Sequence, residues 1–144
     1  FVVLDDGKGT AEVTIYNEVL DQARSLLRED QLVVVEVRVL QRVGDDGEAQ
    51  GVRVMADAVY DLDAVRRRWA KRLKLACNGN ADARKLAEIL APFRSDGVPV
   101  TVLCSNGSVA GEVDLADSWR VTPDGALIER LGEWLEPANV ALVY

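Results

Sequence analysis

The chain has 144 residues, of which 49% are hydrophobic and 28% are charged, and its net charge is −7. These proportions are typical of a globular protein with one ordinary domain or two small ones. The sequence contains no histidine, which excludes Ser/His/Asp and Cys/His catalytic systems and histidine-ligated metal sites. It shows neither a signal-peptide pattern nor an apolar run of roughly 20 residues, and these features predict a soluble, cytoplasmic protein without membrane contact.

The net negative charge of the chain comes from its first part. Residues 1–62 carry 13 acidic and 6 basic side chains, whereas residues 63–144 carry 11 of each. An acidic balance argues against strong non-specific DNA binding. The two cysteines, Cys77 and Cys104, have no second cysteine near them, so each is predicted to be a buried free thiol.

The opening stretch FVVLDDGKGTAEVTIYN alternates apolar and polar residues around a charged, glycine-rich turn, which predicts a β-hairpin. The pairs Asp5-Asp6 and Asp45-Asp46 lie beside glycine, and this composition favours turns over a catalytic or Mg²⁺-binding role. Because a hairpin begins at the first residue, without a polar run-in, we expect the sequence to be a piece of a longer protein.

Next along the chain, helical spacing predicts a helix over 18–30 with Asn17 as its N-cap. The alternating valines of 31–43 predict a strand, the segment GDDGEAQG predicts a loop, and 51–62 predicts a further strand. This order predicts a small β-barrel with one helix between its middle strands. It is the order of an OB-fold that lacks its first strand.

The second part of the chain begins near Leu62, with a bridging helix predicted over 63–74. A short strand (KLACN), a turn at 78–80 and an amphipathic helix over 81–93 follow. A hairpin is then predicted across Asn106-Gly107, a helix behind Thr122-Pro123, and a last strand at NVALVY. The predicted domains are therefore 1–62, the bridging helix 63–74, and a β-α-β-β-α-β domain over 75–144.

Several stretches, in order, resemble the carboxy-terminal region of the bacterial DNA polymerase III alpha subunit. The family pattern L-x-D-x-x-G-x-x-E-V-x-x-(F/Y) matches at Leu4, Asp6, Gly9, Glu12, Val13 and Tyr16. The helix-entry pattern matches at 61–66, and VPVTVLCS and SWRVTPDGALIERLGEWLEPANVALVY resemble the extreme carboxy-terminal domain of that subunit. The opening pattern alone is weak, because other nucleic-acid-binding OB-folds carry similar hairpins.

The resemblance implies that the fragment has no catalytic, metal or cofactor site of its own. The acidic residues that hold the parent polymerase's Mg²⁺ ions lie far upstream in this family. The OB-fold is implied to contact single-stranded template, weakly here because of its charge of −7. The basic residues available for that contact are Lys8, Arg38, Arg42 and Arg53. For each arginine, a solvated strand face is the alternative.

The carboxy-terminal domain in this family docks onto the tau subunit of the clamp loader. Tryptophan is enriched among interface anchors, and a terminal apolar strand leaves an edge that a partner can extend. The residues predicted to form the docking surface are Trp134, Leu135, Val140, Leu142 and Tyr144. The alternative is that the tryptophans fill a small core. The alternative function for the whole chain is a stand-alone nucleic-acid-binding OB protein with an unrelated α+β partner domain.

Overall fold

The computed structural model describes residues 1–79 and 82–144, and it divides into two compact units. Unit 1 comprises Phe1–Leu62 and unit 2 comprises Asp63–Tyr144. None of the helices in the described ranges combines the length and the apolar composition that a membrane span requires.

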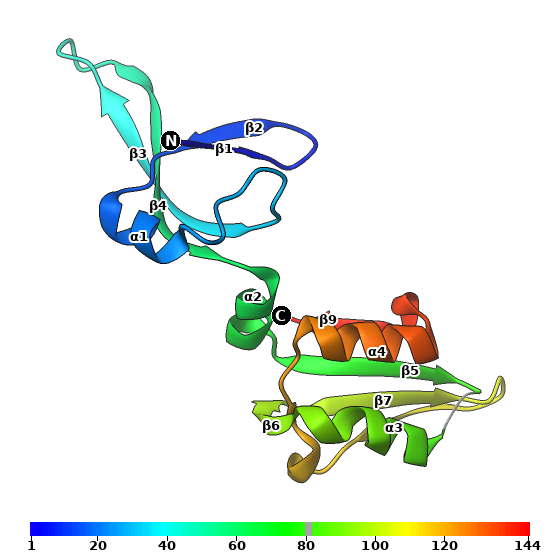
Figure 1. The fold of residues 1–144 in the computed structure, drawn as a ribbon. Coiled ribbons are helices and arrows are strands. Elements are labelled where there is room, and N and C mark those ends of the chain that lie inside the picture. The colour runs from blue at the N-terminus through cyan, green and yellow to red at the C-terminus, as the bar shows by residue number, and fades with distance from the viewer. Residues whose placement is uncertain (80–81) are drawn as a thin grey trace. The chain divides into compact units, whose positions relative to one another are not determined.

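Unit 1 consists of two antiparallel hairpins with a short helix between them (Figure 1). Its elements are β1 (Val2–Asp5), β2 (Thr10–Val13), α1 (Asn17–Ala23), β3 (Val34–Val43) and β4 (Ala49–Tyr60). The hairpins are joined where Thr14 forms a parallel bridge to Met55, with backbone hydrogen bonds from Thr14 to Val54 and from Ala56 to Thr14. β4 therefore has hydrogen-bonded neighbours on both sides at this point.

The core of unit 1 is small. Among its described residues, the buried hydrophobic side chains are Val13, Ala23 and Ala56. The β3–β4 ribbon instead exposes much apolar surface, and its exposed large side chains are Val34, Val37, Val39, Leu40, Val43 and Val52. Two irregularities in register, between Glu36 and Val37 and between Gln41 and Val43, interrupt the alternation of faces along β3.

Unit 2 is built on a four-stranded sheet in the order β8-β7-β5-β9. Its elements are α2 (Leu62–Trp69), β5 (Arg72–Asn78), α3 (Ala83–Leu90), η1 (Ala91–Phe93), β6 (Arg94–Val98), β7 (Val100–Ser105), β8 (Ala110–Asp114), η2 (Asp117–Trp119), α4 (Gly125–Leu135), η3 (Pro137–Asn139) and β9 (Val140–Val143). β5 pairs in parallel with β7 and antiparallel with β9. The predicted β-α-β-β-α-β order is confirmed as β5-α3-β7-β8-α4-β9, with β6 as an addition before β7.

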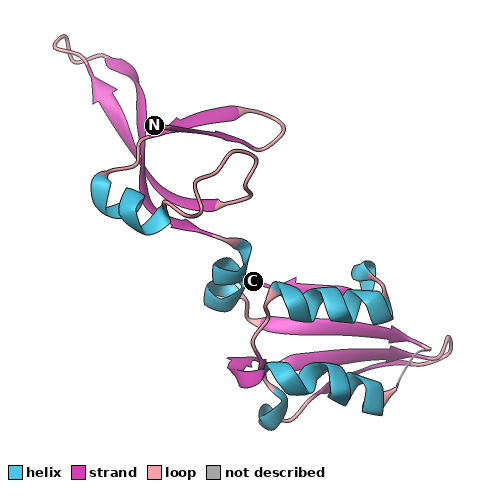
Figure 2. Cartoon of the chain, in the orientation of Figure 1, coloured by secondary structure: helices cyan, strands magenta, loops and turns pink. Residues whose placement is uncertain are grey.

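One face of the sheet is covered by α3 and α4, and the core of unit 2 lies between these helices and the sheet (Figure 2). Alternate residues of β5 and β7 point into this layer, and Leu73 and Leu75 are fully buried. They pack with Leu90, Leu127 and Leu131 from the helices. This arrangement follows from strand periodicity, which sends every second side chain to the helix-covered face.

Two glycines are required by the backbone of unit 2. Gly107 has φ +86° in the β7–β8 turn, where the Asn106 side chain accepts hydrogen bonds from the backbone N–H groups of Ser108 and Val109. Gly97 lies so close to Val121 that an added Cβ would stand 2.0 Å from its carbonyl oxygen. The predicted Asn-Gly hairpin is therefore confirmed.

Several predicted element ends were wrong. The helix predicted over 18–30 ends at Ala23, and Tyr16 rather than Asn17 occupies its N-cap position. The bridging helix ends at Trp69, because Arg72 already pairs with Val143 in the sheet.

The other two corrections concern the helices α3 and α4 of unit 2. α4 is capped by Asp124, whose carboxylate accepts a hydrogen bond from Leu127, and not by Thr122. The helix predicted over 81–93 ends at Leu90, where η1 follows, and it is capped in the same way by Asp82. The predicted turn at 78–80 and the predicted start of that helix at 81 lie partly outside the described residues.

We expect Leu131→Ala to lower the free energy of unfolding of unit 2 by about 2–5 kcal/mol, because it leaves a cavity in a fully buried site. Urea unfolding followed by tryptophan fluorescence measures this, since Trp69, Trp119 and Trp134 all lie in unit 2. Val109→Ala, at a side chain that is 70% exposed, is the control and is expected to change the value by less than about 0.5 kcal/mol. Equal effects would contradict the assigned core.

Candidate functional site

The turn between β1 and β2 is built by the residues of the opening motif. The Asp6 carboxylate accepts hydrogen bonds from the backbone N–H groups of Lys8 and Gly9 at 2.9 Å each, and Asp5 accepts one from Gly7 at 2.7 Å. The bonds from Lys8 and Gly9 lower the pKa of Asp6 below its usual range. These aspartates hold the turn, as the sequence predicted, and the turn presents the exposed Lys8 to solvent.

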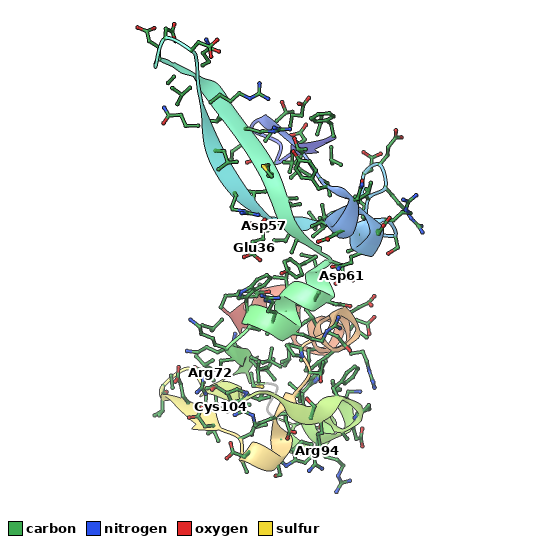
Figure 3. All side chains as sticks on the ribbon, turned by 90° about the vertical axis from the view of Figure 1, so that its left-hand side faces the viewer. Glu36, Asp57, Asp61, Arg72, Arg94 and Cys104 are labelled. Atoms are coloured by element: carbon green, nitrogen blue, oxygen red, sulfur yellow. The ribbon has the colours of Figure 1, made fainter. Side chains whose placement is uncertain are left out.

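The arginines of the β3–β4 ribbon differ in their surroundings. The Arg38 guanidinium forms a bidentate pair with Asp57, with N–O distances of 2.6 to 3.0 Å. The hydrogen bonds and the charge of Asp57 raise the pKa of Arg38. Figure 3 labels Asp57 on this ribbon together with Glu36, whose carboxylate accepts a hydrogen bond from the Tyr60 hydroxyl. Arg38 therefore lies on a solvated face, where its charge is largely compensated.

Arg53 is partly buried, and its guanidinium lies 6.0 Å from the centre of the Tyr16 ring. Its Nε is buried and has no hydrogen-bond partner among the residues that the structure describes. Arg42 is exposed near the end of β3. Of the four basic residues singled out in the sequence, Arg38 and Arg53 thus share the ribbon's central part, Arg42 lies toward its tip, and Lys8 lies on the other hairpin.

The residues predicted to dock a partner differ in how deeply unit 2 buries them. Leu135 is only 3% exposed and belongs to the core, while Trp134, Val140 and Leu142 are half-buried against it. Tyr144 is 55% exposed beyond the end of β9. β9 is an edge strand, because β5 alone pairs with it in the described part of the chain. An edge strand with an exposed aromatic residue at its end is suited to adding a partner strand.

The sheet face opposite the helices carries a compensated set of charges. Arg72 on β5, labelled in Figure 3, pairs with Asp114 on β8 at 2.9 Å. The buried Thr101 hydroxyl lies between them and bonds to both. Lys74, two residues after Arg72 on β5, pairs with Glu112 on β8. Because each cation has its own carboxylate, this face offers little net charge to a polyanion.

Other aromatic and thiol groups in unit 2 have structural roles. The Arg94 guanidinium covers the Trp119 ring at 4.6 Å and donates to the Ser118 carbonyl. Burial, followed by the charge of Cys104, raises the pKa of the Cys77 thiol. Cys77 is buried as predicted, whereas Cys104 is half-buried. In the described ranges, no three histidine, cysteine, aspartate or glutamate side chains gather as metal ligands.

A groove beside β9 was not predicted from the sequence. It is lined by Ile128, Gly132, Pro137 and Val140, with Glu129 and Glu133 at its rim. The sequence feature that could have indicated this groove is Gly132, because glycine is disfavoured relative to alanine in the middle of an amphipathic helix.

Comparisons with known proteins identify relatives of the chain. A model of the DNA polymerase III subunit alpha, C-terminal domain, matches residues 85–135. DNA polymerase III alpha subunits align with nearly the whole chain. The subunit of Pseudomonas aeruginosa is 32% identical over 148 residues, which cover 100% of this chain. The subunit of Neisseria meningitidis serogroup A is 29% identical over 143 residues, which cover 97% of this chain. That of Escherichia coli K12 is 26% identical over 145 residues, or 98% of the chain. The alignment spans 12% of each relative's length.

These matches confirm the resemblance read from the motifs. The chain is a relative of the carboxy-terminal region of the DNA polymerase III alpha subunit.

We expect the β1–β2 turn to lose stability in acid. Because the folded pKa of Asp6 is lowered, its contribution is present above the unfolded value of about 3.9 and is lost as the pH falls through the folded pKa. An NMR titration of the Asp6 carboxyl and of the Gly9 amide measures this. Asp6→Asn is expected to remove the pH dependence of the Gly9 signal, and a Gly9 signal that still titrates in this variant would contradict the assignment.

Proposed function

We propose that this relative of the DNA polymerase III alpha subunit is a non-catalytic, carboxy-terminal part of a replicative polymerase and acts in chromosomal DNA replication. The observation that carries the proposal is the alignment, which follows the alpha subunits along the whole chain and through both units. Nucleotidyl transfer and its Mg²⁺ ions are assigned to other parts of the parent protein. The chain itself contributes binding surfaces.

We assign to unit 2 the docking of the polymerase onto the tau subunit of the clamp loader. Support comes from the family model, which falls on α3 through α4, and from the open edge of β9 next to it. Tyr144 and Val143 are exposed at this edge, and an exposed aromatic side chain beside unpaired strand groups is a typical anchor for a partner. Of the predicted docking residues, Tyr144 offers the most surface, while Leu135 acts from the core by holding α4 on the sheet.

We assign to unit 1 a weak contact with single-stranded template, made by an OB-fold. The order of two hairpins around a helix supports this, as does the Thr14–Met55 bridge, which joins the hairpins into one hydrogen-bonded system. The exposed valines of β3 and β4 fit a barrel wall that a further strand would cover. Since Arg38 is paired with Asp57 and Arg53 is half-buried, Lys8 and Arg42 are the cations best placed to meet phosphates.

Docking predicts that the chain binds a cognate tau subunit with one-to-one stoichiometry in calorimetric titration. Tyr144→Ala is expected to weaken binding at least about fivefold, as the loss of an anchor does, without changing the stability of unit 2. Val109→Ala, in the turn between β7 and β8, is the matched control and is expected to bind as the parent does. A folded chain that releases no heat with tau would contradict the docking function.

Template contact predicts a salt-dependent affinity for single-stranded DNA. Each phosphate contact contributes a slope of about −0.7 to the dependence of log K on log salt concentration. The double variant Lys8→Ala/Arg42→Ala is expected to reduce the slope by up to about 1.4 and to weaken binding of all sequences equally. Arg84→Ala/Lys85→Ala on α3 removes the same charge from unit 2 and serves as the control in fluorescence anisotropy titrations. An equal loss in both variants would contradict the assignment to unit 1.

A further inference from the structure

We propose that the groove between α4 and β9 receives an extended segment of the docked protein, in which basic residues flank an apolar side chain. This inference rests on the docking function proposed above. It adds the place where the segment lies and the chemistry that recognises it.

The groove has a volume of about 470 Å³ and an apolar floor. Ile128 and Gly132 contribute from α4, Pro137 from η3, and Val140 from the start of β9. Figure 1 shows α4 lying beside β9, and the groove reaches the open edge of the sheet at Val140, the first residue of β9. An apolar floor of this kind suits an apolar side chain of the segment.

Gly132 keeps the groove open, although packing does not demand a glycine there. It lies in the interior of α4, where glycine lowers helix stability relative to alanine. An added Cβ would meet the Cα and Cγ atoms of Pro137 at 3.6 Å, which is ordinary van der Waals contact. A residue that weakens its own helix without a steric reason fits a functional role, here the depth of the groove.

Glu129 and Glu133 give the rim a negative charge. They stand four residues apart on α4, where two like charges repel one another and destabilise the helix. Neither forms an ion pair with a cation in the part of the chain that the structure describes. A segment with basic side chains on both sides of its apolar residue would relieve this repulsion and gain two charge contacts.

The backbone of β9 determines that the segment is extended. Leu73 donates its N–H to the Pro99 carbonyl on the β7 side, and Lys71 donates to the Val143 carbonyl on the β9 side. Because successive residues of a strand direct their backbone groups to opposite sides, Val143 faces β5 and Leu142 faces outward. The outward N–H and C=O groups of Leu142 can therefore pair with an added strand, whose side chains reach the groove beside Val140, whereas the Val140 N–H already donates to the Pro137 carbonyl.

The test is calorimetric titration of the 144-residue chain with a cognate full-length tau subunit. Glu129→Lys/Glu133→Lys is expected to weaken binding at least tenfold, and most strongly at low salt, because it reverses the charge of the rim. Glu88→Lys/Asp96→Lys makes the same change in net charge at exposed positions on α3 and β6, and is expected to bind as the parent does.

A second variant separates groove depth from rim charge. Gly132→Ala is expected to raise the thermal midpoint of unit 2, through better helix propensity, and yet to weaken tau binding severalfold by making the groove shallower. If the parent chain binds tau and both groove variants bind it equally well, the groove assignment is overturned and the docking function stands. Failure of the folded parent chain to bind tau would overturn the docking function itself and, with it, this inference.

Discussion

The double-sided pairing of β5 is the constraint on which unit 2 depends. Its parallel ladder with β7 and its antiparallel ladder with β9 place Leu73 and Leu75 under the helices with no exposure. Among the strands that the structure describes, β5 is also the only neighbour of β9, so this one pairing fixes how β9 presents its outer edge. Both the proposed docking surface and the groove below α4 are consequences of that register, because Val140 is aligned with Leu75.

Unit 1 is organised differently, since its order comes from turns and ladders more than from a core. Its described residues bury three hydrophobic side chains, whereas the core cluster of unit 2 holds thirteen. The Asp6 turn and the Thr14–Met55 bridge hold the hairpins together, while valines on both β3 and β4 remain in solvent. Apolar strand surface of this extent fits the proposal that unit 1 is part of a larger β-structure.

The periodicity of apolar residues predicted most of the fold, but it failed at helix ends, where neighbouring polar side chains compete to cap the helix. The β-α-β-β-α-β order and the Asn106-Gly107 hairpin followed from alternation and turn chemistry, and both are confirmed. Helix ends were less predictable: Thr122-Pro123 looked like a cap, but the Asp124 carboxylate captures the Leu127 amide instead. The sequence identified Asp6 as a turn residue. It could not show that Arg38 is paired with Asp57 or that Gly132 and Pro137 line one groove, because the members of each pair lie on different elements of the fold.

The central claim, that the outer edge of β9 docks a partner strand, is tested most directly by hydrogen exchange of the chain with and without tau. The account predicts slower exchange at the outward amides of Leu142 and Tyr144, and little change at β8, the opposite edge of the sheet. Protection of β8 with β9 unaffected would contradict the account.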